Sequence, residues 1–255
     1  VTGHGFDVYD LPFQGKYWME KIKKILQSAD RVLTVSKSNE RIIKKMGVDN
    51  VKVFPNAYST DLFYFKNKEE CREKLVLPIK KKIILTIGNL ENVKGYKYLV
   101  KAIDIVRNIE PGILCLHIGG GSCDEEIRET IKERGLDGNI KLLGTISHHK
   151  LINYFGASDF FVSSSLSEGN PTVMFESLGC GKPFIGTKVG GVPEVINSDE
   201  YGLLCEPKDE KALAENIQKA LERDWNTEKI LNYGKQFSWK NICKNILEIY
   251  KGVLE

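Results

Sequence analysis

The sequence predicts an α/β protein built from doubly wound parallel sheets, and two observations support this prediction. Short runs of β-branched and apolar residues recur along the chain, and segments with helical apolar spacing lie between them. Such alternation is typical of a parallel sheet covered by helices. The expected strands are residues 31–35, 51–54, 82–88, 113–119, 140–144, 160–164, 183–186 and 202–205.

The expected helices each carry one apolar face. In each of them the apolar residues are three or four positions apart, which places them on one side of a helix. The helix near the end of the chain needs a partner surface to bury this side. The three faces consist of Leu99, Ala102, Ile103 and Val106; of Leu213, Ile217, Ala220 and Leu221; and of Trp239, Ile242, Cys243, Ile246 and Tyr250.

A polar segment with turn residues, 56–75, predicts a domain boundary. We expect a partial amino-terminal domain at 1–66, a complete doubly wound domain at 67–237 and a final helix at 238–255 that packs back toward the first domain. The first domain holds too few strands to be complete, and the chain opens with Val1 instead of methionine. We therefore expect a truncated amino-terminal domain in a piece of a longer protein.

Composition excludes several classes of protein. The 255 residues are 42% hydrophobic and 28% charged, which is typical of a globular chain. A net charge of +3, with lysines scattered among glutamates, does not suggest a nucleic-acid partner. No apolar run approaches the ~20 residues of a membrane span. The six cysteines form no C-x-x-C pair, so we expect reduced core thiols in a cytoplasmic protein.

Two glycine-rich loops follow expected strands, where ligands of open parallel sheets bind. In the segment 88–95, Lys94 precedes Gly95 at the start of a helix and can meet a phosphate there, although this loop taken alone favours a solvated turn lysine. The segment 118–126 has three glycines, but Asp124 occupies the last glycine position of G-x-G-x-x-G. An NAD-linked oxidoreductase is therefore disfavoured.

The segment "SEGNPTVMFESLGCGKP", residues 167–183, carries the most specific pattern. Asn170 is the expected N-cap and Pro171 the first residue of a helix. Glu168 would then lie in the preceding loop, and Glu176 in the second turn, behind the N–H groups of Thr172 and Val173.

Two carboxylates would thus flank a pyrophosphate bound at the helix start. Carboxylates accept paired hydrogen bonds from vicinal hydroxyls, which sugars and riboses carry. The alternative is that Glu176 pairs with a lysine on a solvated helix face.

The segment from Glu168 through Glu176 to "LGCGKPFIGTKVGGVPEVI" is similar to the signature of the family 4 retaining glycosyltransferases of GT-B fold. Further segments resemble that family in the same order along the chain. They include "HGFD", "TVSKSNERIIKKMG", "VFPNAYSTDLF", "LTIGNLENVKGYKYLVKAI", "LHIGGGSCDEEI", "KLLGTISHHKLINYFGASDFFVSSSLSEGNP" and "FSWKNI". The resemblance covers essentially the whole chain.

This resemblance implies two Rossmann-like domains, with the nucleotide-sugar donor held by the second. Glu176 would bind the ribose hydroxyls, and Glu168, a catalytic candidate, the donor sugar. Lys94 and the amides near Thr172 and Val173 would hold the diphosphate. Gly88, Asn89, Asn170 and Pro171 complete the donor site, and Ile146 would touch the base through its backbone. His4, the other catalytic candidate, would reach across the cleft toward the donor sugar. One departure is Asn89, where the family often has arginine.

The resemblance implies transfer of a sugar, with retention of configuration, from a UDP-, GDP- or ADP-sugar to a saccharide or lipid-linked acceptor in surface polysaccharide or glycoconjugate synthesis. No nucleophile is evident, so the hypothesis is front-face attack in which the leaving diphosphate takes the acceptor's proton. We expect no metal and no cofactor. The alternatives are a nucleotide-sugar epimerase or phosphorylase of the same fold and a non-catalytic nucleotide-sugar-binding protein.

A basic segment near the start bears on location. We expect a basic helix around Lys21, Lys23 and Lys24, with the apolar residues Trp18, Ile22 and Ile25 behind the lysines. Such a helix can contact an anionic membrane surface, where lipid-linked acceptors reside, although the pattern favours a solvated lysine face. The expected location is the cytoplasm, with peripheral contact at the inner face of the cytoplasmic membrane as one option.

Overall fold

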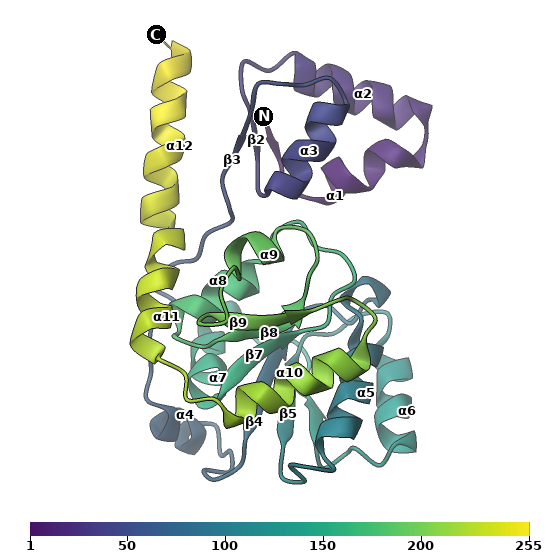
Figure 1. The fold of residues 1–255 in the computed structure, drawn as a ribbon, viewed down its shortest axis with the longest axis vertical. Helices are drawn as coiled ribbons and strands as arrows, with labels where there is room; N and C mark the ends of the chain where they lie inside the picture. Colours follow the sequence, from purple (N-terminus) through teal and green to yellow (C-terminus); the bar gives the residue numbers. More distant parts are fainter. Residues whose placement is uncertain (255) are drawn as a thin grey trace.

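Two separate parallel sheets organise the structure, a computed structural model that describes residues 1–254 (Figure 1). The small sheet has the order β1-β2-β3, with bounds Thr2–Gly3, Val32–Thr34 and Val51–Val53. The large sheet has the order β6-β5-β4-β7-β8-β9. In chain order its strands are β4 Ile83–Ile87, β5 Leu114–Ile118, β6 Ile140–Leu142, β7 Phe160–Ser163, β8 Phe184–Thr187 and β9 Gly202–Cys205.

The strand order of the large sheet determines where a ligand can enter. From β4 the chain builds outward through β5 to β6, and from β7 it builds in the opposite direction through β8 to β9. The strand order therefore reverses between the adjacent strands β4 and β7, and ligands of doubly wound folds bind beside such a point at the carboxyl edge of the sheet. All eight strands expected from the sequence are confirmed, and β1 is an additional two-residue strand.

Helices connect the strands of both sheets. The four short 3-10 turns are η1 Leu11–Gln14, η2 Asn92–Lys94, η3 His148–Lys150 and η4 Lys235–Phe237. The α-helices are α1 Phe6–Tyr9, α2 Lys16–Gln27, α3 Lys37–Lys45, α4 Lys68–Lys74, α5 Tyr96–Val106, α6 Asp124–Glu133, α7 Leu151–Ala157, α8 Thr172–Gly179, α9 Val192–Val195, α10 Glu210–Glu222, α11 Thr227–Gly234 and α12 Trp239–Leu254. Within residues 1–254, none of these helices combines the length and apolar character needed to cross a bilayer.

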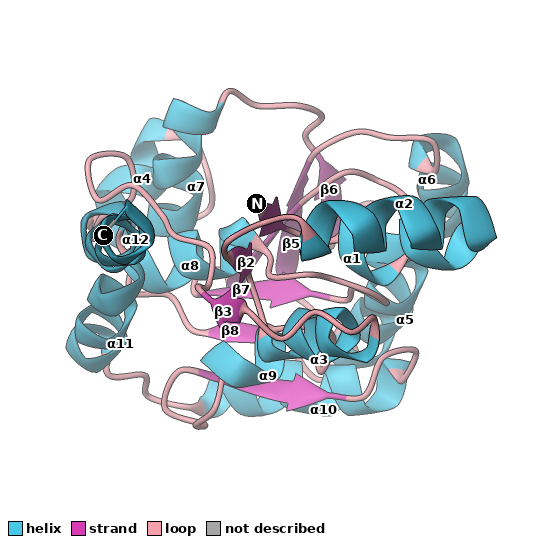
Figure 2. Cartoon of the chain, turned by 90° about the horizontal axis from the view of Figure 1, so that it is seen from above, coloured by secondary structure: helices cyan, strands magenta, loops and turns pink. Residues whose placement is uncertain are grey.

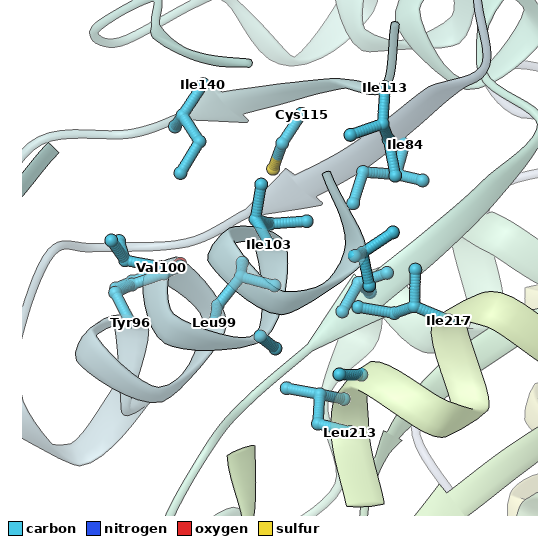
Figure 3. Close-up of a cluster of buried hydrophobic side chains, with 14 of the residues drawn as sticks. Ile84, Tyr96, Leu99, Val100, Ile103, Ile113, Cys115, Ile140, Leu213 and Ile217 are labelled. Atoms are coloured by element: carbon cyan, nitrogen blue, oxygen red, sulfur yellow. The ribbon is translucent and has the colours of Figure 1, made fainter. Parts of the chain in front are cut away.

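Each face of the large sheet has its own apolar core. On one face, α5, α6 and α10 bury side chains such as Leu99, Ile103 and Ile217 against the strands (Figure 3). On the other face, α7, α8 and α11 pack around a set of phenylalanines that includes Phe161 and Phe175. Helices on both faces make the sheet doubly wound, as the sequence predicts, and central strands such as β4 and β5 are buried on both of their sides.

The final helix, α12, runs beside both sheets, and the view from above shows it nearly end-on (Figure 2). Its first residue is fixed to the large-sheet side, because the Trp239 N–H donates to the Tyr58 carbonyl at 3.0 Å. Its apolar face turns toward the small sheet, and Ile242 is buried there beside a cavity of about 150 Å³. Cys243 is exposed, so the expectation of six core thiols is wrong at this position, although the other five are buried.

An ionic cluster beneath the large sheet fixes α4 to β4 and β7. The buried Arg72 guanidinium donates to the Ala157 carbonyl at 2.8 Å and pairs with Asp159 at 3.0 Å. The second Asp159 oxygen pairs with Lys68 at 3.0 Å, and the Ile83 N–H donates to the same carboxylate at 2.7 Å. The Asp159 carboxylate thus neutralises the buried Arg72 charge and also accepts the hydrogen bond of the first N–H group of β4.

We predict that Asp159→Ala lowers the free energy of unfolding by about 3 kcal/mol, because the buried Arg72 charge loses its partner. Urea denaturation of the variant and of wild type measures this difference. The matched control is Asp137→Ala, an exposed carboxylate with no ion pair among residues 1–254. Equal stability of the two variants would contradict the structural role of Asp159.

Candidate functional site

The loop after β4 begins at Gly88 and ends at Gly95, and both glycines have positive φ, 156° and 64°. A Cβ atom on Gly95 would lie 2.2 Å from the Ser164 carbonyl oxygen of the loop after β7. Only glycine permits this approach. The loops after β4 and β7 are therefore packed against one another at the carboxyl edge of the sheet.

The glycines after β5 also allow close packing of the backbone, here against the loop after β4. A Cβ on Gly119 would lie 2.0 Å from the Gly88 oxygen, and one on Gly121 would lie 2.5 Å from the Leu90 oxygen. Between them, Gly120 is open, with only the Thr145 hydroxyl oxygen within 4 Å, at 3.9 Å. Of the two roles that the sequence leaves open, close backbone packing accounts for Gly119 and Gly121.

Lys94 and Glu168 form an ion pair between the two loops. The distance from Lys94 Nζ to Glu168 Oε1 is 2.6 Å, and Ser165 Oγ donates to the same oxygen at 2.7 Å. The side chains are 29% and 12% exposed, respectively. The alternative of a solvated turn lysine is therefore wrong. Asn89, which follows Gly88, has an exposed side chain at the same edge of the sheet.

Helix α8 begins at Thr172, one residue later than the sequence suggests. Pro171 is its N-cap, with an extended backbone, and no side chain caps the helix. The expectation that Asn170 caps it is wrong, because the Asn170 side chain instead donates to the Val35 carbonyl at 2.8 Å. The amides of Thr172 and Val173, at the start of α8, thus have no side-chain competitor for an anion.

Glu176 is buried in the second turn of α8, with 6% exposure. Its Oε1 lies 2.8 Å from His148 Nε2, and Oε2 is buried with no hydrogen-bond partner among the described residues. Burial raises the pKa of the Glu176 carboxyl, and the hydrogen bond from His148 opposes that rise. The alternative of a lysine partner on a solvated face is wrong.

His148 was not identified from the sequence. It opens η3, the turn that follows β6, and its ring lies edge-on to the buried Phe63 ring with centroids 5.0 Å apart. The available signal was a histidine in a loop at the carboxyl edge of the sheet. Ile146, two residues earlier in this loop, is half-buried against the apolar core.

The small sheet contacts the loop that carries Glu168. A Cβ on Gly169 would lie 2.4 Å from the His4 carbonyl oxygen, so His4 adjoins Glu168 through the backbone. The His4 side chain is exposed. Asn56 Nδ2 donates to the Asn170 carbonyl at 2.6 Å, which ties the segment after β3 to the same loop.

Glu194, in the quoted segment "GGVPEV", has a role that sequence reasoning did not assign. Its two oxygens accept the N–H groups of Lys37 and Ser38, at 2.8 and 3.0 Å, across the gap between the sheets. A carboxylate at the start of α3 also suits the helix dipole. These hydrogen bonds and that of Asn170 connect the part of the chain around the large sheet to the part around the small sheet.

The chain resembles known proteins over most of its length. The sequence model described as "Glycosyl transferases group 1" matches residues 67–237. A Bacillus subtilis protein, provisionally named a teichuronic acid biosynthesis glycosyltransferase, is 32% identical over 231 residues, which are 89% of this chain and 56% of that protein. The chain spans about half the length of the curated relatives it matches.

Two solved structures share the fold. A glycosyltransferase of Rickettsia africae superposes with a TM-score of 0.83 at 26% identity, covering 100% of this chain and 70% of the other. HepE of Anabaena, solved in complex with UDP, superposes with a TM-score of 0.86 at 20% identity, covering 98% and 72%. Both agree with the GT-B fold expected from the sequence.

We predict that Glu176→Met stabilises the unliganded chain by about 1 kcal/mol at pH 7, because the variant removes a buried carboxylate with an unpartnered oxygen. The raised pKa of Glu176 means that the native state binds more protons than the unfolded chain above pH 4.5. Wild-type stability therefore falls as the pH rises through this range, and the variant lacks that fall.

Chemical denaturation between pH 4 and pH 7 measures the effect. The control is Glu215→Met, in which an exposed glutamate on α10 is replaced. A constant difference between wild type and Glu176→Met over this range would refute the burial argument.

Proposed function

Because the chain belongs to the group 1 glycosyl transferases, we propose that it binds a nucleotide-diphosphate sugar at the start of α8 and transfers the sugar to an acceptor. The observation that carries this proposal is the unpartnered Oε2 of Glu176, a buried acceptor one turn behind the free amides of α8. A ribose hydroxyl is the donor that suits a carboxylate oxygen there, with the diphosphate at the amides.

We assign positions to the diphosphate, the sugar and the base of the donor in the same way. The diphosphate lies at the amides of Thr172 and Val173, within reach of Lys94, and the sugar extends toward Glu168. His4 adjoins Glu168 from the small sheet, which supports its place beside the sugar. Ile146 lies on the loop of His148, near Glu176, which supports its place at the base.

Lys94 changes partner when the donor binds. Without donor its ammonium is neutralised by Glu168 at 2.6 Å. A diphosphate offers more negative charge than one carboxylate, so Lys94 turns to the phosphates and frees Glu168 Oε1 for a sugar hydroxyl. Binding of the diphosphate and binding of the sugar are thereby coupled.

The proposed reaction retains the anomeric configuration and places the protein in family 4. The bond from the anomeric carbon to the phosphate oxygen breaks, and the acceptor oxygen bonds to that carbon on the same face. The acceptor's proton passes to the leaving diphosphate, whose growing charge is stabilised by Lys94 and the amides of α8. Saccharides and lipid-linked saccharides are the proposed acceptors, in surface polysaccharide or glycoconjugate synthesis.

A peripheral site at a membrane surface suits a lipid-linked acceptor. The exposed aromatic side chains of Tyr17 and Trp18 on α2 lie beside the ammonium of Lys21, which is 5.4 Å from each ring centroid. Aromatic rings together with lysines favour an anionic bilayer surface. The inner face of the cytoplasmic membrane is the location that we propose.

We predict that Glu176→Ala weakens binding of the donor on the order of 100-fold, because two ribose hydroxyls lose a charged acceptor. Titration calorimetry measures the affinity, after a thermal-shift screen of UDP-, GDP- and ADP-sugars has identified the donor. UDP-sugars come first, since HepE, which shares the fold, was solved with UDP. Glu215→Ala is the control, and unchanged affinity of Glu176→Ala would remove the ribose assignment.

Transfer needs no metal in this proposal, since Lys94 and the helix amides stabilise the leaving group. We therefore expect the full-length protein to keep its transferase activity in excess EDTA. Release of the nucleotide with and without acceptor measures that activity. Complete loss in EDTA, with recovery on adding Mg²⁺ or Mn²⁺, would show that a metal ion shares this task.

A further inference from the structure

Glu176 meets a described partner at only one of its oxygens, and that partner is His148. The 2.8 Å contact from Nε2 to Oε1 therefore determines how the carboxylate is rotated about its last bond. Without it, a carboxylate rotates readily, because its terminal torsion is broad. The direction of Oε2 thus depends on the imidazole.

His148 is itself held in place, although its side chain is 57% exposed. Its ring packs edge-on to Phe63, which is 1% exposed and packs in turn against Phe155. The imidazole is fixed on one side by this apolar contact and on the other by Glu176. Its Nε2 must carry the proton to donate to the carboxylate, so the Glu176 contact also determines the tautomer.

We infer that His148 is a positioning residue that aims the Glu176 carboxylate so that Oε2 meets a ribose hydroxyl. This inference rests on the proposed function, and it concerns recognition of the ribose, not the chemistry at the sugar. His148 acts through Glu176 and touches neither the diphosphate nor the transferred sugar. Its effect is therefore confined to ligands that carry the ribose hydroxyls.

Among the titratable side chains near Glu176 in the described part of the chain, His148 is the one that pairs with it. Cys180, the residue that follows α8, stays a neutral thiol because burial raises its pKa. Lys182 donates to the carbonyls of Gly156 and Ser158 at the end of α7, at 3.1 and 2.7 Å. Lys94 is paired with Glu168.

The test compares ribose and deoxyribose ligands. UDP, GDP and ADP are titrated calorimetrically against the wild-type chain, each beside its 2′-deoxy form, and the tightest pair is kept. We expect wild type to prefer the ribose form by about tenfold. His148→Ala should lose most of that preference, and His149→Ala, the adjacent exposed histidine, should retain it.

Additional variants separate positioning from loss of structure. His148→Gln keeps a donor near Oε1 and should restore part of the ribose preference. In a Glu176→Ala background, His148→Ala should have no further effect, since its target is gone. Thermal melting confirms that the variants fold, as replacement of a half-exposed side chain allows.

The outcomes distinguish the two proposals. If wild type binds none of the three nucleotides, the proposed function and this inference both fail. If wild type prefers the ribose form and His148→Ala prefers it equally, the proposed function stands and the inference is overturned. A loss that persists in the Glu176→Ala background would likewise overturn it, because His148 would then act independently of Glu176.

Discussion

The loop between β7 and α8 is the constraint on which the site depends, because it contacts the loop after β4, the loop after β8 and the small sheet. From within the large sheet, a Cβ on Gly190 would lie 1.8 Å from the Glu168 carbonyl oxygen. From the small sheet, His4 approaches Gly169 and Val35 accepts from Asn170. Backbone contacts this close leave no room for a side chain on Gly169 or Gly190, so the loop that carries Glu168 is closely packed against both sheets.

The same region shows a conflict between stability and function. A carboxyl buried like that of Glu176 would be better replaced by an apolar side chain if packing were the only requirement. An N-terminal turn without a side-chain cap on α8 likewise forgoes a stabilising contact. Both features leave hydrogen-bonding groups free at one place, as a site for a polar, anionic ligand requires.

The sequence predicts the large sheet well and the site only in part. Strand positions follow from local apolar patterns, so all eight expected strands are present, and the positions of Glu168 and Glu176 around α8 follow from the helix start. Glu168 pairs with Lys94, 74 positions away, and Glu176 pairs with His148, 28 positions away. No local pattern in the sequence indicates such contacts. The prediction that Asn170 caps α8 is wrong for the same reason, because its side chain donates instead to the Val35 carbonyl, 135 positions away.

Asn89 affects how the proposed site would hold a diphosphate. The family that the sequence resembles often has arginine here, and the exposed amide in its place supplies no charge. In the proposed site Lys94 would then provide the cation at this loop, and in the structure its ammonium is paired with Glu168 at 2.6 Å. In the proposed site, a ligand that only engages Lys94 would leave Glu168 without its counter-ion, whereas a complete nucleotide-sugar would replace that ion pair with a sugar hydroxyl. Under this proposal, the exchange would favour the intact donor over its free diphosphate product.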